Sequence, residues 1–135
     1  MNAQQAEAFA KDWIAAWKRR DAEAVLSHYS DDVEFQSPLV VVLLGDSSGT
    51  VRGKQHLREY FQKVLTTFPE PANTELLEVY QGVESLLVHF QVGGSKGIEV
   101  MELNQKERVR RAITLGSTLN PPLPPLPKTH HGERL

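Results

Sequence analysis

The stretch Asp21–Pro38, DAEAVLSHYSDDVEFQSP, decides how helix and sheet meet in this chain. Asp21 is of the type that caps a helix N-terminus, and the apolar side chains after it are spaced as on one face of a short helix. The Ser-Asp-Asp sequence at 30–32 predicts the end of that helix, and residues 33–37 alternate in the manner of a strand. Pro38 should stop or bend this strand, because proline lacks the N–H that a sheet ladder needs.

Two longer amphipathic helices flank this stretch. Between residues 4 and 19, large apolar side chains such as Phe9, Trp13 and Trp17 recur at helical spacing. Residues 54–67 show the same periodicity, and prolines follow directly after it, which predicts where the helix ends. The chain is therefore expected to start with three helices.

The second half of the chain has the pattern of strands. Four extended runs, at 74–81, 84–92, 97–104 and 108–116, are separated by glycine-rich or polar turns, as in antiparallel hairpins. Both faces of the second run are partly apolar, which is expected of a curved sheet that has helices on one side and a partner subunit on the other. The apolar run Leu39–Leu44 is interpreted as a short strand or a buried loop, followed by a turn.

Length, charge and composition narrow the functional classes. With 135 residues and a net charge of −2, the chain has the size of one domain and no basic excess that would favour nucleic acid or an anionic membrane surface. It has no cysteine, which excludes disulfides, a thiolate nucleophile and a cysteine metal site. The N-terminal sequence lacks the regions of a secretory signal, so we expect a cytoplasmic protein.

A change of composition divides the chain into two parts. From Leu119 onward the sequence reads LNPPLPPLPKTHHGERL, which is rich in proline and predicts an extended, flexible tail without a sheet ladder. We therefore expect one domain at 1–118 and a tail at 119–135. Docking of the tail to a partner protein is an alternative that rests on composition alone.

Three helices followed by a strongly curved antiparallel sheet resemble the α+β, cone-shaped (cystatin-like) fold of the nuclear transport factor 2-like superfamily. The motif W-x3-W-x3-D-A-E-A-V-L-x-x-Y-x-D-D-V-x-F-x-x-P at 13–38 is similar to its SnoaL-like and ketosteroid-isomerase-like branches. So is R-G-K-x-x-L-R-x-Y-F at 52–61. The resemblance implies an apolar pocket between the helices and the sheet, and a homodimer formed through the outer sheet face.

The residues that carry chemistry in ketosteroid isomerases are only partly present. Those enzymes keep a general-base aspartate before the proline of the first strand, where this chain has Ser37, and a hydroxyl without an activating partner does not remove a carbon-bound proton near neutral pH. Their oxyanion-hole tyrosine aligns with Trp13, which retains an N–H donor. Their late-strand acid is retained as Glu99. The resemblance therefore implies the fold and the pocket but argues against that reaction.

Glu99 is the first candidate for a catalytic residue. Strand alternation places it beside Met101 on a face with apolar neighbours, where desolvation should raise the pKa of its carboxyl group. The alternative is a structural ion pair with Arg110 or Arg111. His89 is a second candidate, as a general base or hydrogen-bond donor, although a hydrogen-bonded histidine of the sheet or of a dimer surface fits the pattern better.

The remaining candidates are residues expected to line the pocket. Ser37 would supply a hydrogen bond, and the expected substrate-binding side chains are Trp13, Trp17, Phe35, Tyr60 and Met101. The two tryptophans lie one helical turn apart and suit core packing as well as an aromatic wall. Two other histidines, His28 and His56, are expected to face solvent, and we expect no metal site and no cofactor.

These observations leave two functional classes. In one, the domain binds an apolar carbonyl compound and performs acid/base isomerisation, cyclisation or dehydration. In the other, it is a non-catalytic ligand-binding or dimerisation module of the same fold. In both, the expected partners are an apolar small molecule and a second copy of the chain, with no nucleic acid and no membrane.

Overall fold

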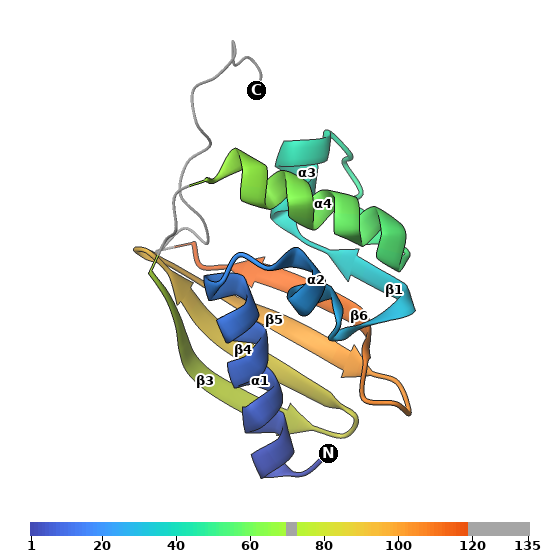
Figure 1. Cartoon of the computed structure of the whole chain (residues 1–135), viewed down its shortest axis with the longest axis vertical. Helices are drawn as coiled ribbons and strands as arrows, with labels where there is room; N and C mark the ends of the chain where they lie inside the picture. Colours follow the sequence, from blue (N-terminus) through green and yellow to red (C-terminus); the bar gives the residue numbers. More distant parts are fainter. Residues whose placement is uncertain (70–72, 119–135) are drawn as a thin grey trace.

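The computed structural model describes residues 1–69 and 73–118 (Figure 1). The proline-rich segment predicted at 119–135 lies outside these residues. The helices are α1 (Ala3–Lys18), α2 (Ala22–Leu26), α3 (Pro38–Leu44) and α4 (Lys54–Thr67). The strands are β1 (Tyr29–Gln36), β2 (Thr50–Arg52), β3 (Thr74–Gly82), β4 (Ser85–Val92), β5 (Ser95–Leu103) and β6 (Val109–Gly116).

The strands form one curved sheet in the order β2-β1-β6-β5-β4-β3. All neighbours are antiparallel except β1 and β6, which run parallel. Helix α1 packs against β3, and α4 packs against β1 and β2, so that the helices cover one face of the sheet (Figure 1). The α+β cone fold expected from the sequence is confirmed, with the parallel β1–β6 pair as the feature that hairpin patterns did not predict.

The core lies between the helices and the covered face of the sheet. Strand β5 shows this most clearly, because its residues alternate strictly between buried and half-buried from Ser95 to Leu103. This alternation turns Gly97, Glu99 and Met101 toward the helices. Among the described residues, no helix has both the length and the apolarity that a membrane span requires.

The prediction for Leu39–Leu44 is wrong, because this run forms helix α3. Ser37 caps the helix by accepting a hydrogen bond from the Leu39 N–H at 3.2 Å, and Pro38 occupies the first turn, where its missing N–H costs nothing. Gly45, at φ +68°, ends the helix in the left-handed conformation. The Ser-Pro start and the Gly end therefore outweigh the strand preference of three consecutive valines.

The boundary between α2 and β1 also differs from the prediction. Helix α2 ends at Leu26, and β1 already begins at Tyr29, so that the Ser-Asp-Asp sequence at 30–32 belongs to the strand. Tyr29 pairs with Val109 of β6, and the register then shifts before Glu34, which marks an irregularity across the acidic pair. Strand β1 is thus longer than predicted because it pairs with β6, which is distant in the sequence and which the local pattern does not indicate.

His28 is buried, contrary to the expectation that it faces solvent. Its ring packs edge-on against Phe9 with the ring centroids 4.9 Å apart. Its Nε2 lies 2.9 Å from a carboxylate oxygen of Asp12, and its Nδ1 lies 3.1 Å from the Val25 carbonyl oxygen. Each ring nitrogen thus lies beside an oxygen acceptor, one from α1 and one from α2, so His28 joins α1 to the end of α2. His56 is exposed, as expected.

Candidate functional site

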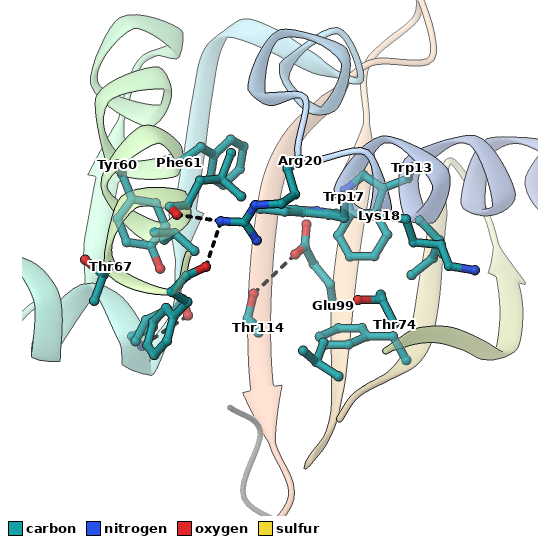
Figure 2. Close-up of a pocket in the computed structure, with 18 of the residues that line it drawn as sticks. Trp13, Trp17, Lys18, Arg20, Tyr60, Phe61, Thr67, Thr74, Glu99 and Thr114 are labelled. Atoms are coloured by element: carbon teal, nitrogen blue, oxygen red, sulfur yellow. Dashed lines mark hydrogen bonds between the residues drawn. The ribbon is translucent and has the colours of Figure 1, made fainter. Parts of the chain in front are cut away.

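A cavity of about 420 Å³ lies between α1, α4 and the covered face of the sheet (Figure 2). Most of the side chains that line it are apolar. The residues proposed from the sequence that line it are Trp13, Trp17, Phe35, Ser37, Tyr60 and Glu99. The residues that the family resemblance, together with helix spacing and strand alternation, indicated for the pocket therefore form much of its wall.

The aromatic wall comes from three elements whose rings meet edge to face. On α1, the ring centroids of Trp13 and Trp17 lie 6.4 Å apart. Trp17 packs against Phe61 of α4 at 5.1 Å, and Phe61 packs against Phe35 of β1 at 5.6 Å. Such contacts stabilise the core while one side of each ring faces the cavity. Trp13 and Trp17 therefore pack in the core and line the cavity, while their contact with a ligand stays a prediction.

Glu99 is the only carboxyl group among the described residues that line the cavity, and it is only 3% exposed. The Tyr29 hydroxyl donates a hydrogen bond to Glu99 Oε2 at 2.7 Å, and the Thr114 hydroxyl donates to Oε1 at 3.3 Å. The Trp13 indole N–H donates in turn to the Tyr29 hydroxyl at 3.0 Å. A chain of hydrogen bonds thus fixes the carboxyl group from two sides.

The alternative for Glu99, an ion pair with a neighbouring arginine, does not form. Arg110 and Arg111 approach the carboxylate of Glu102 instead, at 2.9 and 3.7 Å. Glu102 lies on the other face of β5, because successive residues of a strand point to opposite sides. Both oxygens of Glu99 therefore meet neutral hydroxyl donors rather than a cation.

This environment favours the protonated form of Glu99. Burial raises the pKa of its carboxyl group from 4.5 to about 7, and the hydrogen bonds from Tyr29 and Thr114 limit the rise. Burial also raises the pKa of the Tyr29 hydroxyl well above its ordinary value, with the nearby Glu99 adding to the effect, so that this phenol remains a donor. Near neutral pH, Glu99 is thus close to its midpoint and able both to give and to take a proton.

Ser37 and Tyr60 form the opposite side of the cavity. The Ser37 hydroxyl accepts the capping hydrogen bond of α3, which ties this side chain to a structural role. Burial raises the pKa of the Tyr60 phenol, and a hydrogen bond with Ser37 opposes the rise. Tyr60, which lines the cavity, therefore stays protonated and neutral.

Two of the proposed site residues do not line the cavity. His89 lies on the outer face of β4, because its neighbours Val88 and Phe90 are the buried ones. Met101 faces the core, but it is completely buried. The described residues contain no group of three histidine, aspartate or glutamate side chains that could hold a metal ion.

Sequence reasoning missed three polar residues that shape the site, namely Tyr29 as the partner of Glu99, Thr114 and Arg20. Thr114 is the direct cross-strand partner of Glu99, so pairing the last two predicted strands would have placed it there. Arg20 follows α1 and lines the cavity through its side chain. Arg20 recurs at helical spacing with Trp13 and Trp17 in the sequence, but that spacing alone gives it no role in the pocket.

Comparison with known proteins relates the chain to one family. The model of the SnoaL-like domain matches residues 10–115. A SnoaL-like protein of unknown function from Burkholderia thailandensis E264 is 32% identical, with a TM-score of 0.81 over 86% of this chain and 97% of the other. A search of curated proteins found no match.

Two more distant structures share the fold. A SnoaL-like protein from Agrobacterium tumefaciens C58, named as a candidate isomerase, is 15% identical with a TM-score of 0.68, covering 84% of this chain and 98% of the other. A protein of unknown function from Burkholderia xenovorans LB400, described as similar to nuclear transport factor 2, is 14% identical with a TM-score of 0.67. That match covers 90% of this chain and 88% of the other.

Proposed function

This chain belongs to the SnoaL-like domain family, and we propose that its cavity binds a small, mostly apolar carbonyl compound with which Glu99 exchanges a proton. The observation that carries the proposal is a carboxyl group, 3% exposed, at the wall of an aromatic cavity of about 420 Å³. Pockets of this kind, with few polar groups in an apolar lining, are typical of small-molecule sites. The Agrobacterium neighbour named as a candidate isomerase agrees with this class of reaction.

Glu99 suits a reaction that begins at a carbonyl oxygen. In its protonated form the carboxyl group can donate a hydrogen bond to that oxygen, which draws electrons from the adjacent carbon and makes its C–H bond more acidic. If Glu99 gives its proton to the carbonyl oxygen and a water molecule takes the C–H proton, the enol forms and the proton returns to Glu99 through solvent; isomerisation, cyclisation and dehydration can share this step. Tyr29 and Thr114 hold the carboxyl group in place, so little reorganisation is needed when the proton moves.

A non-catalytic ligand-binding module is the second candidate, and one observation favours it. Apart from Glu99, the described residues that line the cavity include no carboxylate and no imidazole. Ser37, at the position of the isomerase base, is a capping residue. An acid without a separate base can bind a carbonyl group without turning it over.

Calorimetric titration with 2-acetonaphthone, a neutral aromatic ketone, tests binding. We expect saturable binding to the wild type and its loss in Val64→Trp, because Val64 lines the cavity and an indole ring would fill the space. Val83→Trp is the control, since Val83 lies at the turn between β3 and β4 and is 93% exposed. Equal binding to all three proteins would place the ligand outside the cavity.

Hydrogen exchange in heavy water separates the two functions. If Glu99 is an acid/base catalyst, the wild type should replace the methyl hydrogens of 2-acetonaphthone by deuterium faster than Glu99→Gln, as followed by proton NMR. Binding without accelerated exchange would favour the non-catalytic module. The homodimer and the cytoplasmic location stay predictions.

A further inference from the structure

We propose that the ligand of this cavity carries a carboxylate and that Arg20 binds it, which identifies the substrate class as apolar, carbonyl-bearing carboxylic acids. The inference rests on the proposed function, because it concerns the same cavity. Its starting point is the lining: two cationic side chains, Lys18 and Arg20, border the cavity together with the single acid Glu99.

The guanidinium of Arg20 has donors to spare. Its Nη2 donates to the carbonyl oxygens of Leu65 and Phe68, at 2.5 and 2.7 Å, near the end of α4 (Figure 2). A guanidinium has five N–H donors, and within the described residues Nε and Nη1 of Arg20 form no hydrogen bond and no ion pair. The hydrogen bonds to α4 hold the side chain in place while its remaining donors stay available to a ligand.

The backbone of Arg20 is held in an uncommon conformation. Its φ is +59°, in the left-handed region that residues other than glycine rarely adopt. A backbone hydrogen bond from the Arg20 N–H to the Trp17 carbonyl oxygen, at 3.0 Å, and the two side-chain bonds to α4 maintain it. The Asp21 N–H donates to the Ala16 carbonyl oxygen at 3.1 Å as well, so the left-handed conformation is that of a helix C-terminal cap, which fixes where the Arg20 side chain leaves the backbone.

The charge balance of the cavity favours an anion. Lys18 is exposed and Arg20 is half-buried, so the cations lie where the cavity meets solvent. Glu99 is buried and close to its midpoint near neutral pH, so it offsets this positive charge only in part. A carboxylate at the open end would be attracted to the cations and could accept a hydrogen bond from Nη1 or Nε of Arg20, the nitrogens that the α4 carbonyls leave available.

One ligand can then contact both Arg20 and Glu99. Its carboxylate would meet Arg20 at the solvent-facing end, its apolar body would lie against Trp17 and Phe61, and its carbonyl oxygen would face Glu99. Figure 2 shows these side chains entering the same space from α1, α4, β5 and the connection after α1.

Two probes with the same ring system test the inference. 2-Naphthoate and 2-acetonaphthone differ in whether the ring carries a carboxylate or a neutral ketone. We expect the wild type to bind 2-naphthoate more tightly at pH 7.5 and low salt, and this preference to shrink as salt rises. In Arg20→Gln, the affinity for 2-naphthoate should fall roughly tenfold to a hundredfold, the usual range for a lost hydrogen bond to a charged group. The affinity of that variant for 2-acetonaphthone should change by less than about twofold, within ordinary variation between surface variants.

Arg19→Gln is the matched control, because it removes the same charge from the adjacent, exposed residue that does not line the cavity. It should leave both affinities unchanged. A wild type that binds the two probes equally would overturn the inference without any variant, even if Arg20→Gln failed to fold. Equal losses for both probes in Arg20→Gln would also overturn it, because Arg20 would then act only through α4.

The same titrations keep the two proposals apart. If 2-acetonaphthone binds in the cavity and 2-naphthoate shows no dependence on Arg20, the carboxylate inference is wrong and the proposed function stands. If neither probe binds to the wild type, the proposed function itself is contradicted.

Discussion

Replacing Glu99 by glutamine should make the protein more stable at alkaline pH. Glutamine has the shape of glutamate, and its amide can accept a hydrogen bond from Tyr29 and donate one to the Thr114 oxygen. The substitution therefore removes the ionisable proton while it retains the contacts of the buried side chain. The two proteins therefore differ in one respect. Once Glu99 ionises, the wild type has a buried negative charge, which lowers its stability, and the glutamine variant does not.

The size of the effect follows from the two pKa values. The carboxyl group of Glu99 titrates at 4.5 in an ordinary environment and at about 7 in the folded protein. Above the lower value the unfolded chain has released the proton that the folded protein still holds, so wild-type stability falls as pH rises. The loss approaches about 1.4 kcal/mol per pH unit between the two pKa values, and from pH 5 to pH 9 it amounts to about 2.5 kcal/mol.

Urea denaturation of the two proteins at several pH values between 5 and 9 measures this difference. The free energy of unfolding of Glu99→Gln, relative to that of the wild type, should rise by about 2.5 kcal/mol from pH 5 to pH 9. Glu102→Gln is the control, since it removes a carboxylate from the outer face of the same strand. Parallel curves for the wild type and Glu99→Gln would refute the account of Glu99 as a buried, protonated acid.

Two further substitutions test the surroundings of Glu99. Tyr29→Phe removes a donor that holds the pKa of Glu99 down, so that pKa should rise above 7 by carboxyl NMR. The same change leaves the buried Trp13 N–H without its acceptor, and the free energy of unfolding should fall by about 1 to 3 kcal/mol in urea. Gly97→Ala would bring a methyl group within 3.0 Å of the Phe90 ring and 3.1 Å of the Leu115 carbonyl oxygen. It should cost about 1 to 3 kcal/mol, whereas Gly94→Ala, which meets nothing within 4 Å, should be nearly neutral; equal effects of the two would contradict the packing described for β5.

Local sequence patterns predict those helices and strands whose signals lie within their own residues. Helix α4 matches its prediction at both ends, because apolar side chains repeat at helical spacing and proline follows. The run Leu39–Leu44 was misassigned because its valines favour a strand, while the decisive signals, Ser37 and Gly45, lie at its two ends. The parallel pairing of β1 with β6 joins strands far apart in the chain, and no local pattern contains that information.

The residues of the candidate site also divide into those that local patterns identify and those that depend on the three-dimensional arrangement. Glu99 was found because alternation along β5 places it among buried neighbours, and the family resemblance retains an acid there. His89 alternates just as regularly, but the covered face belongs to its neighbours, which only the three-dimensional arrangement decides. Arg20 shares the helical spacing of Trp13 and Trp17, but its role depends on where its side chain leaves the end of α1, which the periodicity does not describe.

Carboxyl NMR of Glu99, with and without saturating 2-acetonaphthone, tests the central claim most directly. We expect the free protein to titrate with a midpoint near pH 7 and the complex to titrate higher, because a carbonyl oxygen accepts a hydrogen bond only from the protonated acid. A carboxyl group that titrates near 4.5 in the free protein, or a midpoint that saturation with the ketone leaves unchanged, would contradict the claim that Glu99 is the acid of a ligand-binding cavity.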